Sequence, residues 1–179
     1  ENSSEALSPV FAALEEKQLV PTLESNESYT AAEREALQAL LGCPEAQIIS
    51  AQQFAAKHAY TETECATYQA MQTLIDDLNT MHSRAGAQTP FSSLNYGTDT
   101  SPEGRMVIKN MLLAEQAGLG HGETPIFPIH IFKVKEGVNF NPGDPNYDLF
   151  RLACKVSAKR LFPNFSFLDA PFNLQYYKE

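Results

Sequence analysis

The spacing of apolar residues along the first third of the chain is helical. Apolar side chains follow Ser8-Pro9 at intervals of three to five residues, and serine before proline is a common way for a helix to begin. A second helix is predicted to start at the capping box formed by Thr30 and Glu33 and to stop at Gly42. Residue types typical of active sites are missing from this part, so it is interpreted as a structural or linking segment.

The clearest helical pattern predicts a helix over residues 61–81. It begins with a second capping box, made by Thr61 and Glu64. Apolar side chains then recur every three or four residues, which is typical of a helix that packs one face against a core. The positions of this stripe are Cys65, Tyr68, Met71, Leu74, Ile75, Leu78 and Met81.

From residue 88 the pattern alternates between extended and helical segments. Strands are predicted at 88–98, 125–134 and 164–169, with helices at 100–118 and 144–161 between them. The second strand is apolar on both of its faces, which predicts that both faces are covered. A strand, helix, strand, helix, strand order predicts an α/β fold with crossover helices.

Charge and aromatic content divide the chain near residue 60. Residues 1–60 carry a net charge of −6 out of the total of −9, and thirteen of the eighteen aromatic residues follow residue 90. We therefore expect an acidic helical segment at 1–60, of unassigned role, and a main domain at 61–179. An acidic chain repels a phosphate backbone, so no nucleic-acid partner is expected. The absence of a long apolar run or leader pattern predicts a soluble, cytoplasmic protein with no membrane contact.

The cysteines and histidines give no catalytic or metal motif. Cys43, Cys65 and Cys154 are odd in number and lack C-x-x-C spacing, so neither a disulfide framework nor a zinc site is predicted. We expect Cys65 and Cys154 to lie on apolar helix faces with raised thiol pKa values. His130 lies within a predicted strand and is interpreted as a core histidine.

A glycine-rich segment at 118–123 resembles a phosphate-binding loop. A dinucleotide loop follows a strand and precedes a helix, whereas this segment follows a helix and precedes a strand. We therefore interpret Gly118 as a helix C-cap that is followed by a turn.

The strand at 88–98 carries polar side chains where a buried strand would carry valine or isoleucine. Alternation places Phe91, Ser93 and Asn95 on one face, and Ser92, Leu94 and Tyr96 on the other. Buried polar groups persist when they are hydrogen-bonded, either to a ligand or to neighbouring backbone. Both interpretations stay open at this point.

Three runs of sequence resemble the catalytic subunit of anaerobic ribonucleoside-triphosphate reductases. They are TYQAMQTLIDDL (67–78), NTMHSRAGAQTPFSSLNYGTDTSPEGRMVIKN (79–110) and a long stretch over 118–177 that contains DPNYDLF and AKRLFPN. Residues 1–60 do not match the family pattern. The resemblance implies that 61–179 are part of the ten-stranded α/β barrel of a glycyl-radical enzyme. It also implies that the function is anaerobic deoxyribonucleotide synthesis, which supplies DNA replication.

The resemblance also implies where the chemistry lies. The radical glycine, the two reactive thiols and a four-cysteine zinc site of such enzymes map onto no residue of this chain, so we expect no catalytic residue, metal or cofactor within it. The expected partners are a ribonucleoside triphosphate, a nucleotide effector, a radical S-adenosylmethionine activating enzyme and a second copy of the subunit.

Two expectations about this chain follow from the implied barrel. Ser93 and Asn95 would face the barrel interior and bind substrate, with Ser92 a weaker candidate. An isolated chain of this kind would be inactive. The alternative is a non-catalytic nucleotide-binding or scaffold module derived from the same fold.

Overall fold

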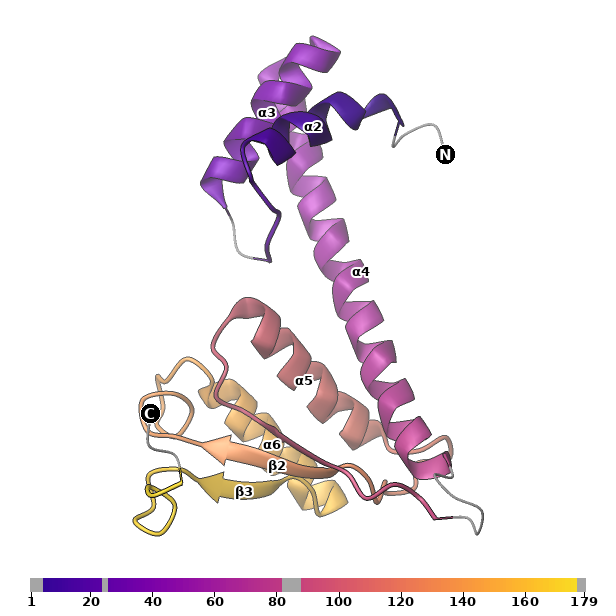
Figure 1. The fold of residues 1–179 in the computed structure, drawn as a ribbon, viewed down its shortest axis with the longest axis vertical. Helices are drawn as coiled ribbons and strands as arrows, with labels where there is room; N and C mark the ends of the chain where they lie inside the picture. The colour runs from indigo at the N-terminus through magenta and orange to yellow at the C-terminus, as the bar shows by residue number, and fades with distance from the viewer. Residues whose placement is uncertain (1–4, 24–25, 82–87, 177–179) are drawn as a thin grey trace. The chain divides into compact units, whose positions relative to one another are not determined.

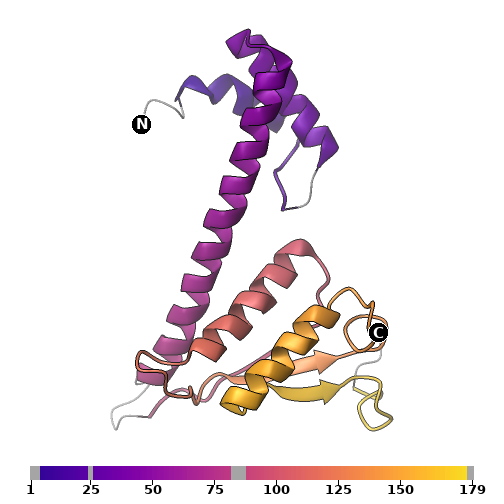
Figure 2. The ribbon, with the colours of Figure 1, turned by 180° about the vertical axis from the view of Figure 1, so that it is seen from behind.

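The computed structural model describes residues 5–23, 26–81 and 88–176. The chain divides into two compact units, Glu1–Thr63 and Glu64–Glu179. Helix α4 (Glu45–Thr80) contributes residues to both units. Each unit is described by itself below, and Figures 1 and 2 show the ribbon from two sides.

The first unit is built from helices. Helix α2 (Ser8–Glu16) contacts α3 (Glu27–Leu41), and the first part of α4 completes the unit. Its buried apolar residues are Val10, Leu14 and Ile48. Many other apolar side chains in this unit are exposed, so its apolar core is small.

Helix α3 starts earlier than its predicted capping box. Asn26 is the N-cap, and its side-chain oxygen accepts a hydrogen bond from the amide of Tyr29 at 3.2 Å. Thr30 lies inside the first turn, where its hydroxyl donates to the carbonyl of Asn26. The predicted stop is confirmed, because Gly42 adopts the left-handed conformation that ends helices.

Helix α4 is one continuous helix of 36 residues, so the predicted start at Thr61 is wrong. The Thr61 hydroxyl donates a 2.9 Å hydrogen bond to the carbonyl of Lys57, four residues earlier. That bond is the pattern of a threonine inside a helix, not of an N-cap. A threonine and a glutamate three residues apart therefore do not by themselves define a helix start.

The second unit is a three-stranded parallel sheet with one helix after each of its first two strands. Its elements in chain order are β1 (Ser93–Tyr96), α5 (Pro102–Ala117), β2 (Ile129–Val134), α6 (Tyr147–Arg160) and β3 (Asn164–Phe167). The strand order is β1-β2-β3, with Ser93 beside Ile129 at one end and Val134 beside Phe167 at the other. Helices α5 and α6 lie on the same face of the sheet (Figures 1 and 2). This α/β arrangement is as predicted.

The main core lies between the sheet and the two helices. Phe132 on β2 is fully buried and makes edge contacts with the rings of Tyr96 and Phe165. A second cluster joins Ile75 of α4 to Met111 and Ala114 of α5. Apolar packing between this face of the sheet and the two helices therefore stabilises the unit. The buried residues of the larger cluster are Ile108, Leu112, Phe132, Val134, Leu149, Ala153 and Val156.

Several predicted boundaries shift. Strand β2 begins at Ile129 instead of residue 125, because Pro125 and Pro128 lack the N–H that a sheet ladder needs. Helix α6 has Asn146 as its N-cap, whereas the carboxylate of Asp144 accepts a hydrogen bond from the amide of Asn141 in the preceding turn. The third strand ends at Phe167 instead of residue 169.

The expected coverage of both sheet faces is not seen within the described ranges. Residues alternate between buried and half-buried along β2, with His130, Phe132 and Val134 on the helix side. The opposite face carries Ile129 and Ile131, which keep partial exposure. We call this second surface the open face of the sheet.

Candidate functional site

Ser93 and Asn95 lie on the open face and are exposed. Ser92 is on the helix side, where its hydroxyl is buried and has no hydrogen-bond partner among the described residues. The alternation predicted for this strand is confirmed, because Leu94 and Tyr96 pack against the helices. Ser93 and Asn95 are thus on the open face, and Ser92 is on the face that the helices cover.

The loop after β1 is held close to β2 at the carboxyl edge of the sheet. Gly97 has a φ of +125°, and a Cβ atom there would lie 2.7 Å from the carbonyl oxygen of Lys133. Its own carbonyl accepts hydrogen bonds from the side chains of Asn139 (3.0 Å) and Asn146 (3.2 Å), both fully buried. Parallel sheets commonly bind ligands at this edge, and here the edge has a defined backbone geometry.

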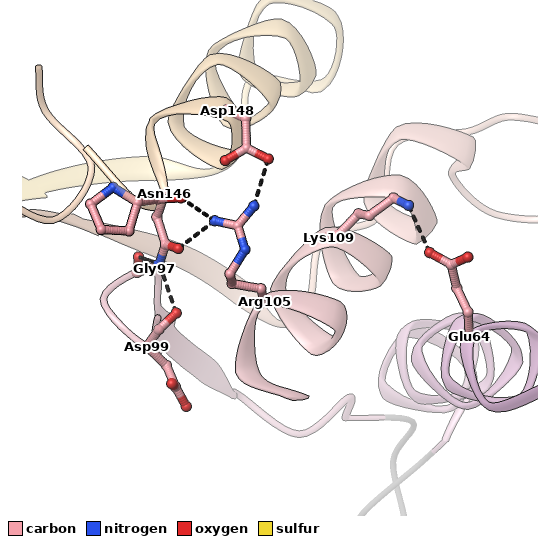
Figure 3. Close-up of polar contacts among 8 residues, drawn as sticks. Glu64, Gly97, Asp99, Arg105, Lys109, Asn146 and Asp148 are labelled. Atoms are coloured by element: carbon pink, nitrogen blue, oxygen red, sulfur yellow. Dashed lines mark hydrogen bonds and ion pairs between the residues drawn. The ribbon is translucent and has the colours of Figure 1, made fainter. Parts of the chain in front are cut away.

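Arg105 joins this loop to the start of α6 (Figure 3). Its guanidinium donates to the side-chain oxygen of Asn146 at 2.6 Å, to the carboxylate of Asp148 at 2.8 Å and to the carbonyl of Pro145. Asn146 in turn donates to the carbonyl of Asp99 at 2.7 Å. Arg105 on α5 therefore links α5 to the start of α6 through hydrogen bonds to protein groups at the carboxyl edge of the sheet.

The start of α5 is capped within the chain. Ser101 is the N-cap, and its hydroxyl accepts from the amide of Gly104. The hydroxyl and amide of Ser101 both donate to the exposed carboxylate of Asp99, and these hydrogen bonds lower the pKa of Asp99. The helix predicted over residues 100–118 is confirmed, and its first helical residue is Pro102.

A buried polar cluster lies on the helix side of the sheet. The Tyr96 hydroxyl is 2.9 Å from Nδ1 of His130, and Nε2 of His130 is 3.1 Å from a carboxylate oxygen of Glu115. The second contact is close enough for an ion pair, but its direction does not make a hydrogen bond. Burial and the negative charge of Glu115 raise the pKa of Tyr96. The interpretation of His130 as a core histidine is confirmed by its burial.

Sequence reasoning did not identify Glu115. It lies three residues after Leu112 and four after Met111, on the helix face that carries the buried apolar residues of α5. The sequence does contain a signal, which is a carboxylate on the apolar face of a helix. Because a buried charge usually has a partner, such a carboxylate indicates a second polar group beside it in the core.

The glycine-rich segment at 118–123 is a turn, as predicted. Gly118 is the C-cap of α5, and Arg160 from the end of α6 covers that helix end. The guanidinium donates to the carbonyls of Gln116, Ala117 and Gly122 at 2.6–3.0 Å. A cation at the negative end of a helix dipole is stabilising, so this segment has a structural explanation.

The expectation that two of the cysteines lie on apolar helix faces is wrong. Cys65 and Cys154 are both exposed, and Cys43 is half-buried. On α4 the side chains toward α5 are those of Glu64 and Thr67, which contact Lys109 and Met106. Cys65 follows Glu64 by one position, about 100° around the helix, and so turns away from α5.

The raised pKa expected for Cys154 is confirmed, and its cause is partial burial of the thiol. Since the thiolate is the reactive form, we expect Cys154 to react with a soluble maleimide in the native state, but slowly at neutral pH. The rate should rise with pH to a midpoint above the ordinary thiol value of about 8.5. Mass-spectrometric labelling against pH, with Cys154→Ser as the blank, measures this. A midpoint at or below the ordinary value would contradict it.

Two negative findings apply to the described residues. No group of three or more histidine, cysteine, aspartate or glutamate side chains there could hold a metal ion. Across the same ranges, none of the helices combines the length and apolar character needed to cross a membrane. His82 lies outside the described residues.

These features define a parallel α/β unit with one helix-covered face and one open polar face. Residues 38–179 match the family model of anaerobic ribonucleoside-triphosphate reductase. The chain therefore belongs to that family, and the matching region begins 23 residues before the resemblance recognised from sequence.

Individual relatives agree with the family match. The chain is 40% identical over 107 residues to an anaerobic ribonucleoside-triphosphate reductase of Haemophilus influenzae, which covers 59% of this chain and 15% of that protein. It is 41% identical over 111 residues to the protein of the same name from Enterobacteria phage T4, covering 62% and 18%. The match to the Escherichia coli protein is 40% over 105 residues, covering 58% and 14%. The chain thus spans less than a fifth of the length of each of these relatives.

Proposed function

We propose that this chain forms part of the catalytic α/β barrel of an anaerobic ribonucleoside-triphosphate reductase and that its open sheet face lines the substrate site. The observation that carries the proposal is a parallel sheet with one face left open in a chain of this family. Parallel sheets are normally covered on both faces. A barrel interior would cover the open face and would account for its polar side chains.

Ser93 and Asn95 have the chemistry that a nucleotide requires. A carboxamide and a hydroxyl can each donate and accept hydrogen bonds, so together they can pair with ribose hydroxyls and with phosphate oxygens. They lie on a strand whose carboxyl end is fixed by Gly97, Asn139 and Asn146. A rigid strand holds such side chains in place better than a loop does.

In this proposal the radical chemistry belongs to other segments of the enzyme. A glycyl radical and reactive thiols on those segments would supply the radical chemistry, and neither they nor the zinc site is assigned to any residue here. The proposal also includes an activating enzyme, a nucleotide effector, assembly of two subunits and a cytoplasmic location. The described residues contribute scaffold and substrate contacts.

Asn95→Ala tests the proposal in the reductase subunit that carries this sequence. Loss of a buried hydrogen bond to substrate costs about 1–3 kcal/mol, so KM should rise roughly 5- to 150-fold. The melting temperature should hardly change, because the Asn95 side chain is exposed in this chain. Anaerobic steady-state kinetics and a thermal unfolding curve measure both quantities.

Gln53→Ala is the matched control, because Gln53 is an exposed carboxamide on α4 in the first unit. It should leave KM unchanged. If Asn95→Ala lowers the melting temperature and leaves KM as it was, Asn95 is structural and the open face is not the substrate site.

A further inference from the structure

The strand register places a second carboxamide in the same row as Asn95. Asn95 on β1 pairs with Ile131 on β2, and Ile131 pairs with Asn164 on β3. Partners across a parallel sheet point to the same face, so Asn164 projects from the open face as Asn95 does. With neighbouring strands about 4.8 Å apart, the two residues stand about 10 Å apart with Ile131 between them.

These two asparagines differ from those that hold the fold. Asn110, Asn139 and Asn146 are 0–2% exposed, and the amide of each donates to backbone carbonyls. Asn95 and Asn164 are exposed, and no described residue makes a hydrogen bond to either side chain. The buried amides are thus occupied by structural bonds, whereas the two on the open face keep their donors and acceptors available.

The next row adds to the polar character of this surface. Lys133 on β2 pairs with Ser166 on β3, one step closer to the carboxyl edge than Ile131 and Asn164. The half-buried side chain of Ile131 offers an apolar surface between the two amides. A ribose ring has apolar C–H groups on its faces and hydroxyls at its edge, which suits an apolar centre with hydrogen-bonding groups on both sides.

We propose that Asn164 is a second substrate-binding residue of this site and that the row Asn95–Ile131–Asn164 binds the ribose–phosphate part of the nucleotide. This inference rests on the proposed function, because it needs the open face to meet substrate. The ribose and its phosphates are common to all ribonucleoside triphosphates. Asn164 therefore contributes equally to binding whichever base the substrate carries.

The test is Asn164→Ala in the complete reductase subunit, assayed anaerobically with ATP, GTP, CTP and UTP. We expect KM to rise roughly 5- to 100-fold, by the same factor for each substrate that is turned over, with kcat within about twofold. Asn164→Asp should raise KM further, because a carboxylate repels the triphosphate and cannot donate. The melting temperature of both variants should match the parent, and Gln53→Ala should leave KM unchanged.

The outcomes separate this inference from the proposed function. If Asn95→Ala raises KM and neither Asn164 variant does, the site is on the open face but Asn164 is not part of it. An effect confined to one base would overturn the assignment to ribose and phosphate. If no variant at either position changes KM, the open face is not the substrate site and both proposals fail.

Discussion

Replacing Glu115 by alanine is expected to lower the free energy of unfolding of this chain by about 3–5 kcal/mol. Its carboxylate is 0% exposed and lies 3.1 Å from Nε2 of His130, which is 1% exposed. Removing one member of a buried pair leaves the other without its partner in a medium of low polarity. The shortened side chain also leaves a cavity beside Tyr96 and His130. Chemical denaturation followed by circular dichroism measures the change.

Two further variants separate burial from charge. Glu103→Ala removes an exposed carboxylate from the first turn of the same helix and should cost less than about 1 kcal/mol. Replacing Glu115 and His130 together by leucine, with Tyr96→Phe to remove the hydroxyl that contacts His130, should recover most of the loss, because no member of the buried polar cluster then remains. A triple variant that is less stable than Glu115→Ala would show that the polar cluster is itself strongly stabilising.

Phe132→Ala is expected to have an effect of similar size, about 3–5 kcal/mol. The ring is 0% exposed at the centre of the main cluster and contacts Tyr96, Phe150 and Phe165. Its removal takes apolar area out of the core and leaves a cavity that the strand backbone cannot fill. Urea unfolding of the chain and the variant measures the loss.

Phe172→Ala is the control for this change. Phe172 is 70% exposed, so truncating it removes little buried area and should change the stability by less than about 0.5 kcal/mol. If both phenylalanine variants were equally stable, Phe132 would not be at the centre of the main core between the sheet and the helices.

The order of elements in the second unit could be predicted because each element has its own local signal. The period-two pattern of residues 91–96 separates the two faces of β1, and the helix predicted over residues 100–118 corresponds to α5. Gly118 ended that helix as its sequence context indicated. Each of these features depends on residues within a few positions of one another.

Features that depend on distant contacts could not be predicted in this way. The pairing of Asn95, Ile131 and Asn164 is set by strand register, which no short stretch of sequence specifies. The environment of Glu115 depends on His130, fifteen residues further along the chain. The exposure of Cys65 and Cys154 depends on which side of each helix faces the neighbouring elements. A shift of one residue along a helix rotates a side chain by about 100°, which can move it from the core to solvent.

The proposed site follows from the sequence only in part. Ser93 and Asn95 are candidates from sequence because polar side chains are unusual in a strand next to an apolar one. Asn164 stands at the first position of a short strand, where an asparagine is unremarkable. Its proposed role depends on the pairing of the three strands, which places Asn164 in the same row as Asn95.

The two faces of the sheet differ in how well they are expected to tolerate amino-acid substitutions. Substitutions on the helix side alter packing around Phe132 and His130, so we expect most of them to lower stability. Ser93, Asn95 and Asn164 are exposed on the open face, so we expect them to change with little loss of stability. The scaffold can therefore be retained while the chemical groups it presents are replaced, by natural drift or by a library randomised at those three positions.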